Sequence, residues 1–256
     1  MYGDIRIPAR MFYRRGVYIK DERGAFSTPG TSGNCASKFL QEYYSKKCGV
    51  STRSKLLEAP YFDVTQQLPM DVMHVLLEGV LSYEIKYLLR YYISEGCFSL
   101  TEINNDIRKF PLGYVHCKDR PFVITEADLS RESSTNLGQT ASRMWMLATI
   151  LPMILSKYVD KDGDHWQCLT SLLEIMGIAF ACKISSESVV YLKSAIREHL
   201  TLFKSLFGAR LIPKQHYLVH LPSQIFKFGP LVRCWCMRYE GKHSFFKDLA
   251  SRIKKF

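Results

Sequence analysis

The chain has 256 residues, of which 47% are hydrophobic and 23% are charged, and these ordinary globular values exclude a largely disordered protein. Its formal net charge of +11 favours a polyanionic partner, with nucleic acid ahead of a membrane surface. The longest uncharged apolar run, residues 144–156, is interrupted by Pro152 and is too short to span a bilayer, so no membrane partner is expected. The 8 cysteines, among them Cys168 and Cys182 in apolar stretches, indicate reduced, buried thiols of an intracellular protein.

Capping residues and apolar periodicity predict a chain of helices. Residues 1–34 are basic and rich in turn residues, and we interpret them as an irregular leader. Helices are expected at 35–47 and 51–58, and a long helix is expected to begin at Pro69 and to end at Gly96. A capping box formed by Ser99 and Glu102 begins another helix that continues to about residue 109.

The second half of the chain continues this pattern. Residues 110–135 are expected to be a loop with at most a short strand at 121–125, and a helix bent at Pro152 follows over 138–159. Further helices are expected at 166–181 and from Ser185 to Gly208, then two short ones, then a last one from near Cys236. The expected fold is mainly α, with a helical domain over 35–210 and a basic segment over 211–256.

The stretch "PMDVMHVLLEGV" has a polar face on an otherwise apolar helix. At about 100° per residue, Asp71, His74 and Glu78 lie on nearly the same side. An acid three residues before a histidine recurs in Asp162–His165 and in Glu240–His243. Each pair is either a salt-bridged or capped histidine or part of a metal site.

One reading of the repeated pattern is a di-metal carboxylate bundle, in which Asp71, His74, Glu240 and His243 bind iron, manganese or zinc. Glu78 and Glu174 would be its additional acids. The spacing of His216 and His220 in "HYLVH" could also place two imidazoles on one metal, although structural histidines are the simpler interpretation. We interpret Cys234 and Cys236 of "CWC" as core thiols, because no second cysteine pair lies at zinc-finger spacing.

Two longer stretches resemble one family. "YFDVTQQLPMDVMHVLLEGVLSYEIKYLL" and "LIPKQHYLVHLPSQIFKFGPLVRCWCMRYEGKHSFFK" look like the central and C-terminal blocks of CACTA (En/Spm)-type transposases and of proteins derived from them. The resemblance implies an RNase H-like (DDE) fold interrupted by a helical insertion, with three acids that bind two divalent metals. Glu240 matches the third acid, while Asp71 and His74 match an accessory motif close to the catalytic core.

The resemblance also implies what this chain lacks. The first two catalytic acids belong on strands upstream of the central block. The only aspartates before Asp63 are Asp4 and Asp21, and neither lies in a strand-like run. Glu240 alone is an incomplete site, because a two-metal centre needs several carboxylates. We therefore expect a truncated, nuclear, transposase-derived protein that is inactive alone and binds Mg²⁺ or Mn²⁺ only when the complete acid triad is supplied. A structural interaction module without catalysis is the remaining alternative.

Basic residues near the end of the chain predict a DNA-binding surface. On the expected last helix, Arg238 and Lys242 share one face, whereas Tyr239, Phe246 and Ile253 share another that we expect to face the core. Together with Arg233 and Lys247, the basic face predicts weak, sequence-independent DNA binding, since phosphate contacts carry no base information. The alternative partner for this surface is the missing N-terminal half or another subunit.

Overall fold

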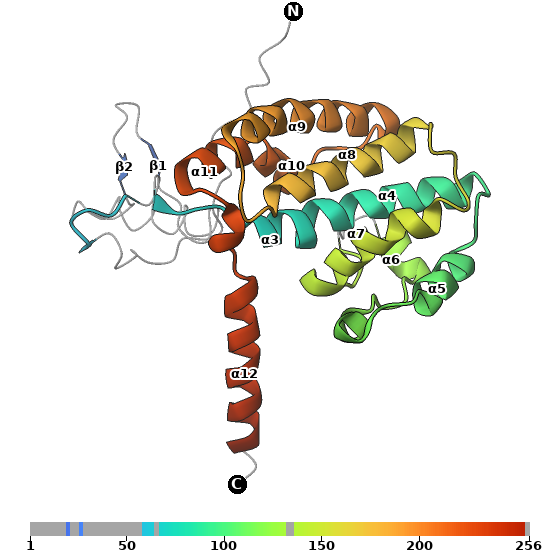
Figure 1. Ribbon diagram of the computed structural model, residues 1–256, viewed down its shortest axis with the longest axis horizontal. Helices are drawn as coiled ribbons and strands as arrows, with labels where there is room; N and C mark the ends of the chain where they lie inside the picture. The colour runs from blue at the N-terminus through green and yellow to red at the C-terminus, as the bar shows by residue number, and fades with distance from the viewer. Residues whose placement is uncertain (1–18, 21–25, 28–57, 64–66, 132–135, 254–256) are drawn as a thin grey trace, which may run out of the picture. The chain divides into compact units, whose positions relative to one another are not determined.

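The computed structural model describes residues 19–20, 26–27, 58–63, 67–131 and 136–253 (Figure 1). Contacts divide the chain into two compact units, Met1–Leu68 and Pro69–Phe256. In the first unit, β1 (Ile19–Lys20) and β2 (Phe26–Ser27) pair antiparallel, with Ile19 opposite Ser27. The helices expected at 35–47 and, except for its last residue, at 51–58 lie outside the described residues, as does the expected boundary after residue 34.

The second unit is mainly helical, as predicted. Its α-helices are α3 (Val72–Val75), α4 (Leu81–Ser94), α5 (Leu100–Lys109), α6 (Glu126–Ser130), α7 (Ala141–Leu155), α8 (Asp164–Ala179), α9 (Ser186–Phe207), α10 (Pro213–Leu218), α11 (Leu221–Phe228) and α12 (Met237–Ile253). A π-helix, η2 (Leu76–Val80), joins α3 to α4, and two 3₁₀ helices are η3 (Tyr114–Asp119) and η4 (Leu231–Arg233). Residues after 210 belong to the same compact unit as the preceding helices, because Leu218, Leu221 and Ile225 are part of its core.

Helix α4 is the centre of this unit. It packs against α8 and also against α6 and α7, and α8 packs most extensively against α9 (Figure 1). Its buried residues include apolar side chains, such as Tyr83 and Ile85, on opposite faces, which is the pattern of a helix surrounded by others. Even Glu84 and Lys86 are buried on α4, so their polar groups must have partners inside the protein.

The long central helix begins later than predicted and is not uniform. Asp71, not Pro69, precedes its first turn and caps it, because the Asp71 side chain accepts a hydrogen bond from the backbone N–H of Met73 at 3.2 Å. The π-turn at Leu76–Val80 then inserts a wider turn before α4. Such insertions are rare and occur frequently at functional sites.

Other helix ends agree with their local sequence signals. Ser99 and Glu102 form the predicted capping box at the start of α5. The Ser185 side chain caps α9 by accepting from the N–H of Ser188 at 3.2 Å. Gly208 ends α9 with φ of 56°, a left-handed conformation that glycine adopts without a steric cost. Pro152 lies inside α7, as expected from its position in the apolar run.

No strand forms at residues 121–125, where the sequence predicts at most a short one. This segment is irregular, and side-chain amides rather than another strand bind its backbone. The Asn104 amide bonds the backbone N–H and C=O of Ile124 at 2.9 and 2.8 Å, and the Gln139 amide bonds those of Phe122 at 2.8 and 3.1 Å. Because an amide offers both a donor and an acceptor, it satisfies one residue of an extended chain as a neighbouring strand would.

The cysteine prediction is correct for Cys168, which is buried, and wrong for Cys182, which is exposed just beyond the end of α8. All described cysteines are free thiols: Cys97, Cys117, Cys168, Cys182, Cys234 and Cys236. An apolar sequence neighbourhood did not bury Cys182 because the helix that would have carried it inward ends at Ala179.

Candidate functional site

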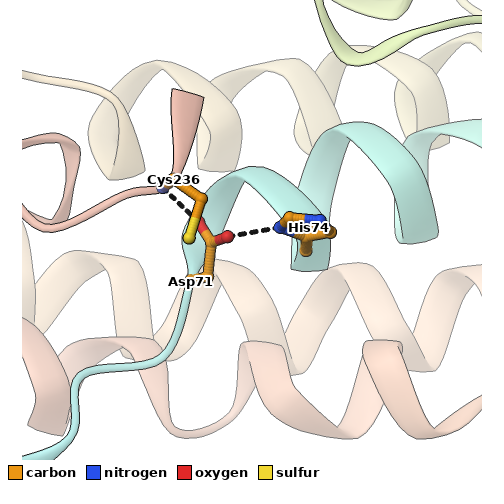
Figure 2. A group of neighbouring side chains, drawn as sticks. All are labelled: Asp71, His74 and Cys236. Carbon is orange, nitrogen blue, oxygen red and sulfur yellow. Dashed lines mark hydrogen bonds and ion pairs between the residues drawn. The ribbon is translucent and has the colours of Figure 1, made fainter. Parts of the chain in front are cut away.

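Asp71 joins two distant segments of the chain at the start of α3 (Figure 2). Its Oδ1 accepts hydrogen bonds from the backbone N–H groups of Met73 and of Cys236, each at 3.2 Å. Its Oδ2 contacts Nδ1 of His74, one turn further along the helix. The carboxylate is therefore held by three groups, and its side chain is only 21% exposed.

His74 presents its other ring nitrogen to two glutamates. Nε2 lies 3.3 Å from Oε1 of Glu240 and 3.5 Å from Oε2 of Glu78. Glu78 belongs to the π-helix and Glu240 to the first turn of α12. The three side chains are half-exposed, so the site is open to solvent on one side. The predicted polar face thus packs beside Glu240, a residue from the second resembling block.

Asp71 fixes which ring nitrogen of His74 can bind a cation or a proton. A carboxylate beside Nδ1 favours a proton on that atom, which leaves Nε2 directed toward the two glutamates. In a neutral His74, Nε2 carries a lone pair, and a divalent ion between it and the carboxylates would complete a carboxylate–histidine–metal arrangement. In a protonated His74, Nε2 instead donates to one of the glutamates. The site therefore suits one cation or one proton.

Sequence reasoning missed two residues at this site, Lys214 and Cys236. Lys214 Nζ donates to the backbone C=O of Glu78 at 2.9 Å. Burial lowers the pKa of Lys214, while the nearby negative charges of Glu78 and Asp71 oppose that shift. Ligand atoms of Asp71, His74 and Cys236 lie within 4.8 Å of one another, so the Cys236 thiol is a further potential ligand. Both residues belong to the second resembling block, and Cys236 is also part of the "CWC" pair, but neither signal indicated a position beside Asp71 and His74.

The residues of the di-metal interpretation are brought together only in part. Glu174 accepts a hydrogen bond from the Tyr191 hydroxyl at 2.8 Å, and no described contact joins it to this site. His243 lies exposed on α12, and no described contact joins it to His74. His165 of the third pair stacks on Tyr91 with ring centroids 3.5 Å apart, and burial lowers its pKa.

The two histidines of "HYLVH" do lie together. Nε2 of His216 and Nε2 of His220 are 3.1 Å apart, at the junction between α10 and α11. Burial, followed by the nearby charge of His216, lowers the pKa of His220, as expected when two imidazoles cannot both be protonated at little cost. Cys234 and Cys236 are only partly buried, so the core-thiol interpretation holds for neither in full.

The four predicted DNA-binding residues, Arg233, Arg238, Lys242 and Lys247, are all exposed. The prediction for the opposite face of α12 is wrong. Tyr239, Phe246 and Ile253 are 68%, 62% and 65% exposed, because no described helix packs against this part of α12 (Figure 1). Phe245 is also exposed, at 64%. These four side chains form part of an exposed apolar surface on α12.

Comparison of the chain with protein-family models, with curated proteins and with solved structures finds no match. Among the helices that the structure describes, none combines the length and the apolar character needed to cross a membrane.

Proposed function

We propose that this chain is a transposase-derived protein whose helices correspond to the helical insertion and the C-terminal helix of an RNase H-like (DDE) fold, and that it binds DNA without cleaving it on its own. The observation that supports this most is the 3.3 Å approach of Glu240 to His74. The two residues come from separate resembling blocks, one near each end of the sequence of the compact unit, and the sequence predicts a site role for each of them.

The site suits one divalent ion rather than two. His74, Glu78 and Glu240 would hold Mg²⁺ or Mn²⁺ only when the missing acids complete the site, with Asp71 orienting the imidazole. Strand cleavage by a two-metal mechanism needs further carboxylates, which the resemblance places on upstream strands. A metal-dependent nicking assay on this chain tests the expected inactivity. Cleavage that Glu240→Gln abolishes would show that the site is complete.

The exposed basic face of α12 would bind the DNA backbone. Arg238 and Lys242 are one turn apart on this helix, and each is two residues from Glu240, so they project from the side of α12 opposite Glu240. Each phosphate neutralised by a lysine or arginine releases counterions and makes affinity depend on salt. The exposed aromatic side chains of α12 would accommodate a protein partner, either another subunit or a strand-bearing segment.

Titration of a labelled duplex at two salt concentrations tests the DNA proposal. Replacing both Arg238 and Lys242 by alanine should reduce the slope of log affinity against log salt by about 1.8, at about 0.9 per phosphate. The matched control replaces Lys193 and Arg197, an exposed pair with the same spacing on α9. Equal effects of the two double variants would mean that α12 is not the DNA-binding face.

A second candidate function, metal binding without DNA, is favoured by the Asp71–His74 contact, which is typical of an oriented metal ligand. Elemental analysis of dialysed protein, together with Mn²⁺ titration of wild type and Glu240→Gln, separates it from the first. Stoichiometric metal that depends on Glu240, without any DNA affinity, would favour this candidate. Protein that binds neither metal nor DNA would leave an interaction module as the function.

A further inference from the structure

Three potential metal ligands meet in the interior, away from the site described above. Glu84 of α4, Cys168 of α8 and His199 of α9 are 4%, 3% and 1% exposed. One ligand atom of each lies within 4.8 Å of the others. No sequence motif connects them, and none of them was a candidate site residue. A buried carboxylate is costly unless it has a partner, so this cluster requires a physical explanation.

Glu84 and His199 each have one polar atom that makes a hydrogen bond and one that makes none. Glu84 Oε1 accepts from the Gln215 side-chain amide at 2.7 Å. His199 Nδ1 lies 2.8 Å from the Ser171 hydroxyl oxygen. The remaining atoms, Glu84 Oε2 and His199 Nε2, are 2.9 Å apart, yet they are not aligned for a hydrogen bond and have no other such partner.

Ser171 determines the tautomer of His199. Its hydroxyl donates to the backbone C=O of Cys168 at 2.9 Å, so its oxygen must accept from His199 Nδ1–H. In a neutral His199, Nε2 then carries a lone pair, which faces an oxygen lone pair of Glu84 in a dry interior. Two such lone pairs repel unless a cation or an added proton lies between them. Imidazoles that bind metals are oriented in this way through their other nitrogen.

Geometry and charge both match zinc. Ligands bound at about 2.0–2.3 Å around a tetrahedral ion lie roughly 3.4 Å from one another, between the observed 2.9 Å contact and the 4.8 Å limit of the cluster. A thiolate, a carboxylate and a neutral imidazole balance the charge of Zn²⁺. A cavity of about 10 Å³, lined by Glu84, Cys168 and apolar side chains including Leu172, borders two of the three ligands.

We propose that Glu84, Cys168 and His199 bind a structural zinc ion that ties α4, α8 and α9 together. The thiol distinguishes this proposal from a proton shared by Glu84 and His199, because a shared proton needs no sulfur ligand. Magnesium is disfavoured, since it prefers oxygen ligands and an octahedral site. The proposal does not depend on DNA binding or on the His74 site.

Zinc content of protein purified without chelators is the first test. Wild type should retain about one zinc per chain after dialysis, and Cys168→Ser and His199→Gln should each lose most of it. The controls, His74→Gln and Cys236→Ser, belong to the other ligand group and should retain it. Zinc that is lost from the controls but kept in Cys168→Ser would overturn the proposal by placing the ion at the other site.

Wild-type measurements keep the proposal testable if the core variants fail to fold. Removal of the metal should lower Tm by about 5 °C or more, and Zn²⁺, but not Mg²⁺, should restore it. Cobalt substitution should produce a thiolate charge-transfer band in wild type and equally in Cys236→Ser. Wild type that contains no zinc and whose Tm does not respond to Zn²⁺ would overturn the proposal in favour of the shared proton.

Discussion

Asp71→Ala tests how the candidate site is assembled, because this carboxylate bonds groups from both ends of the compact unit. The substitution removes the cap of α3, which costs about 1 kcal/mol. It also leaves the part-buried N–H of Cys236 without its acceptor, at a further cost of about 1–2 kcal/mol. We expect the free energy of unfolding to fall by about 2–3 kcal/mol and Tm by about 4–12 °C.

Urea denaturation followed by circular dichroism measures this loss. Ser99→Ala is the matched control, because Ser99 also caps a helix through its side chain but bonds only within its own capping box. It should cost about 1 kcal/mol. If Asp71→Ala costs no more than Ser99→Ala, the link between Asp71 and Cys236 contributes nothing and the reasoning is refuted.

Three further predictions concern the core, the π-turn and pH. Phe203→Ala should cost about 3–5 kcal/mol in denaturant unfolding, since this ring is fully buried. Gly79→Ala should destabilise the protein by about 1–3 kcal/mol, because the added Cβ would lie 2.2 Å from Lys214 Cδ. Gly177→Ala, where the added Cβ meets open space, should stabilise it by about 0.5–1 kcal/mol. Changes in unfolding free energy of the same sign for both variants would contradict this prediction. The pKa of His165 lies below its ordinary 6.5, so its contribution to stability is present above pH 6.5 and is lost as pH falls through the folded-state pKa. His165→Phe should therefore reduce the pH dependence of the unfolding free energy measured from pH 7.5 to 5.

Part of the candidate site could be predicted from sequence. Asp71, His74 and Glu78 share one face of a helix, and helical periodicity alone brings them together. Glu240 was identified by resemblance, but its contact with His74 depends on where α12 begins after η4. Lys214 could not have been predicted, because its position beside Glu78 depends on how α10 packs against the π-turn.

The helical class and the helix boundaries at Ser99, Ser185 and Gly208 could be predicted from the sequence alone. These ends depend on bonds and backbone angles within a few residues, which local sequence encodes. It could not determine that residues 121–125 bind side-chain amides, because the partners Asn104 and Gln139 lie about 20 residues away on either side.

Tertiary packing, and not local sequence, sets which polar residues are buried and which apolar residues are exposed. Glu84 is buried because α6, α7 and α8 pack around α4, and nothing in its local sequence distinguishes it from an exposed glutamate. Phe246 is exposed for the converse reason, since α12 has no described helix against its apolar face. Periodicity predicts that a helix has distinct faces, but which face is buried depends on what packs against it.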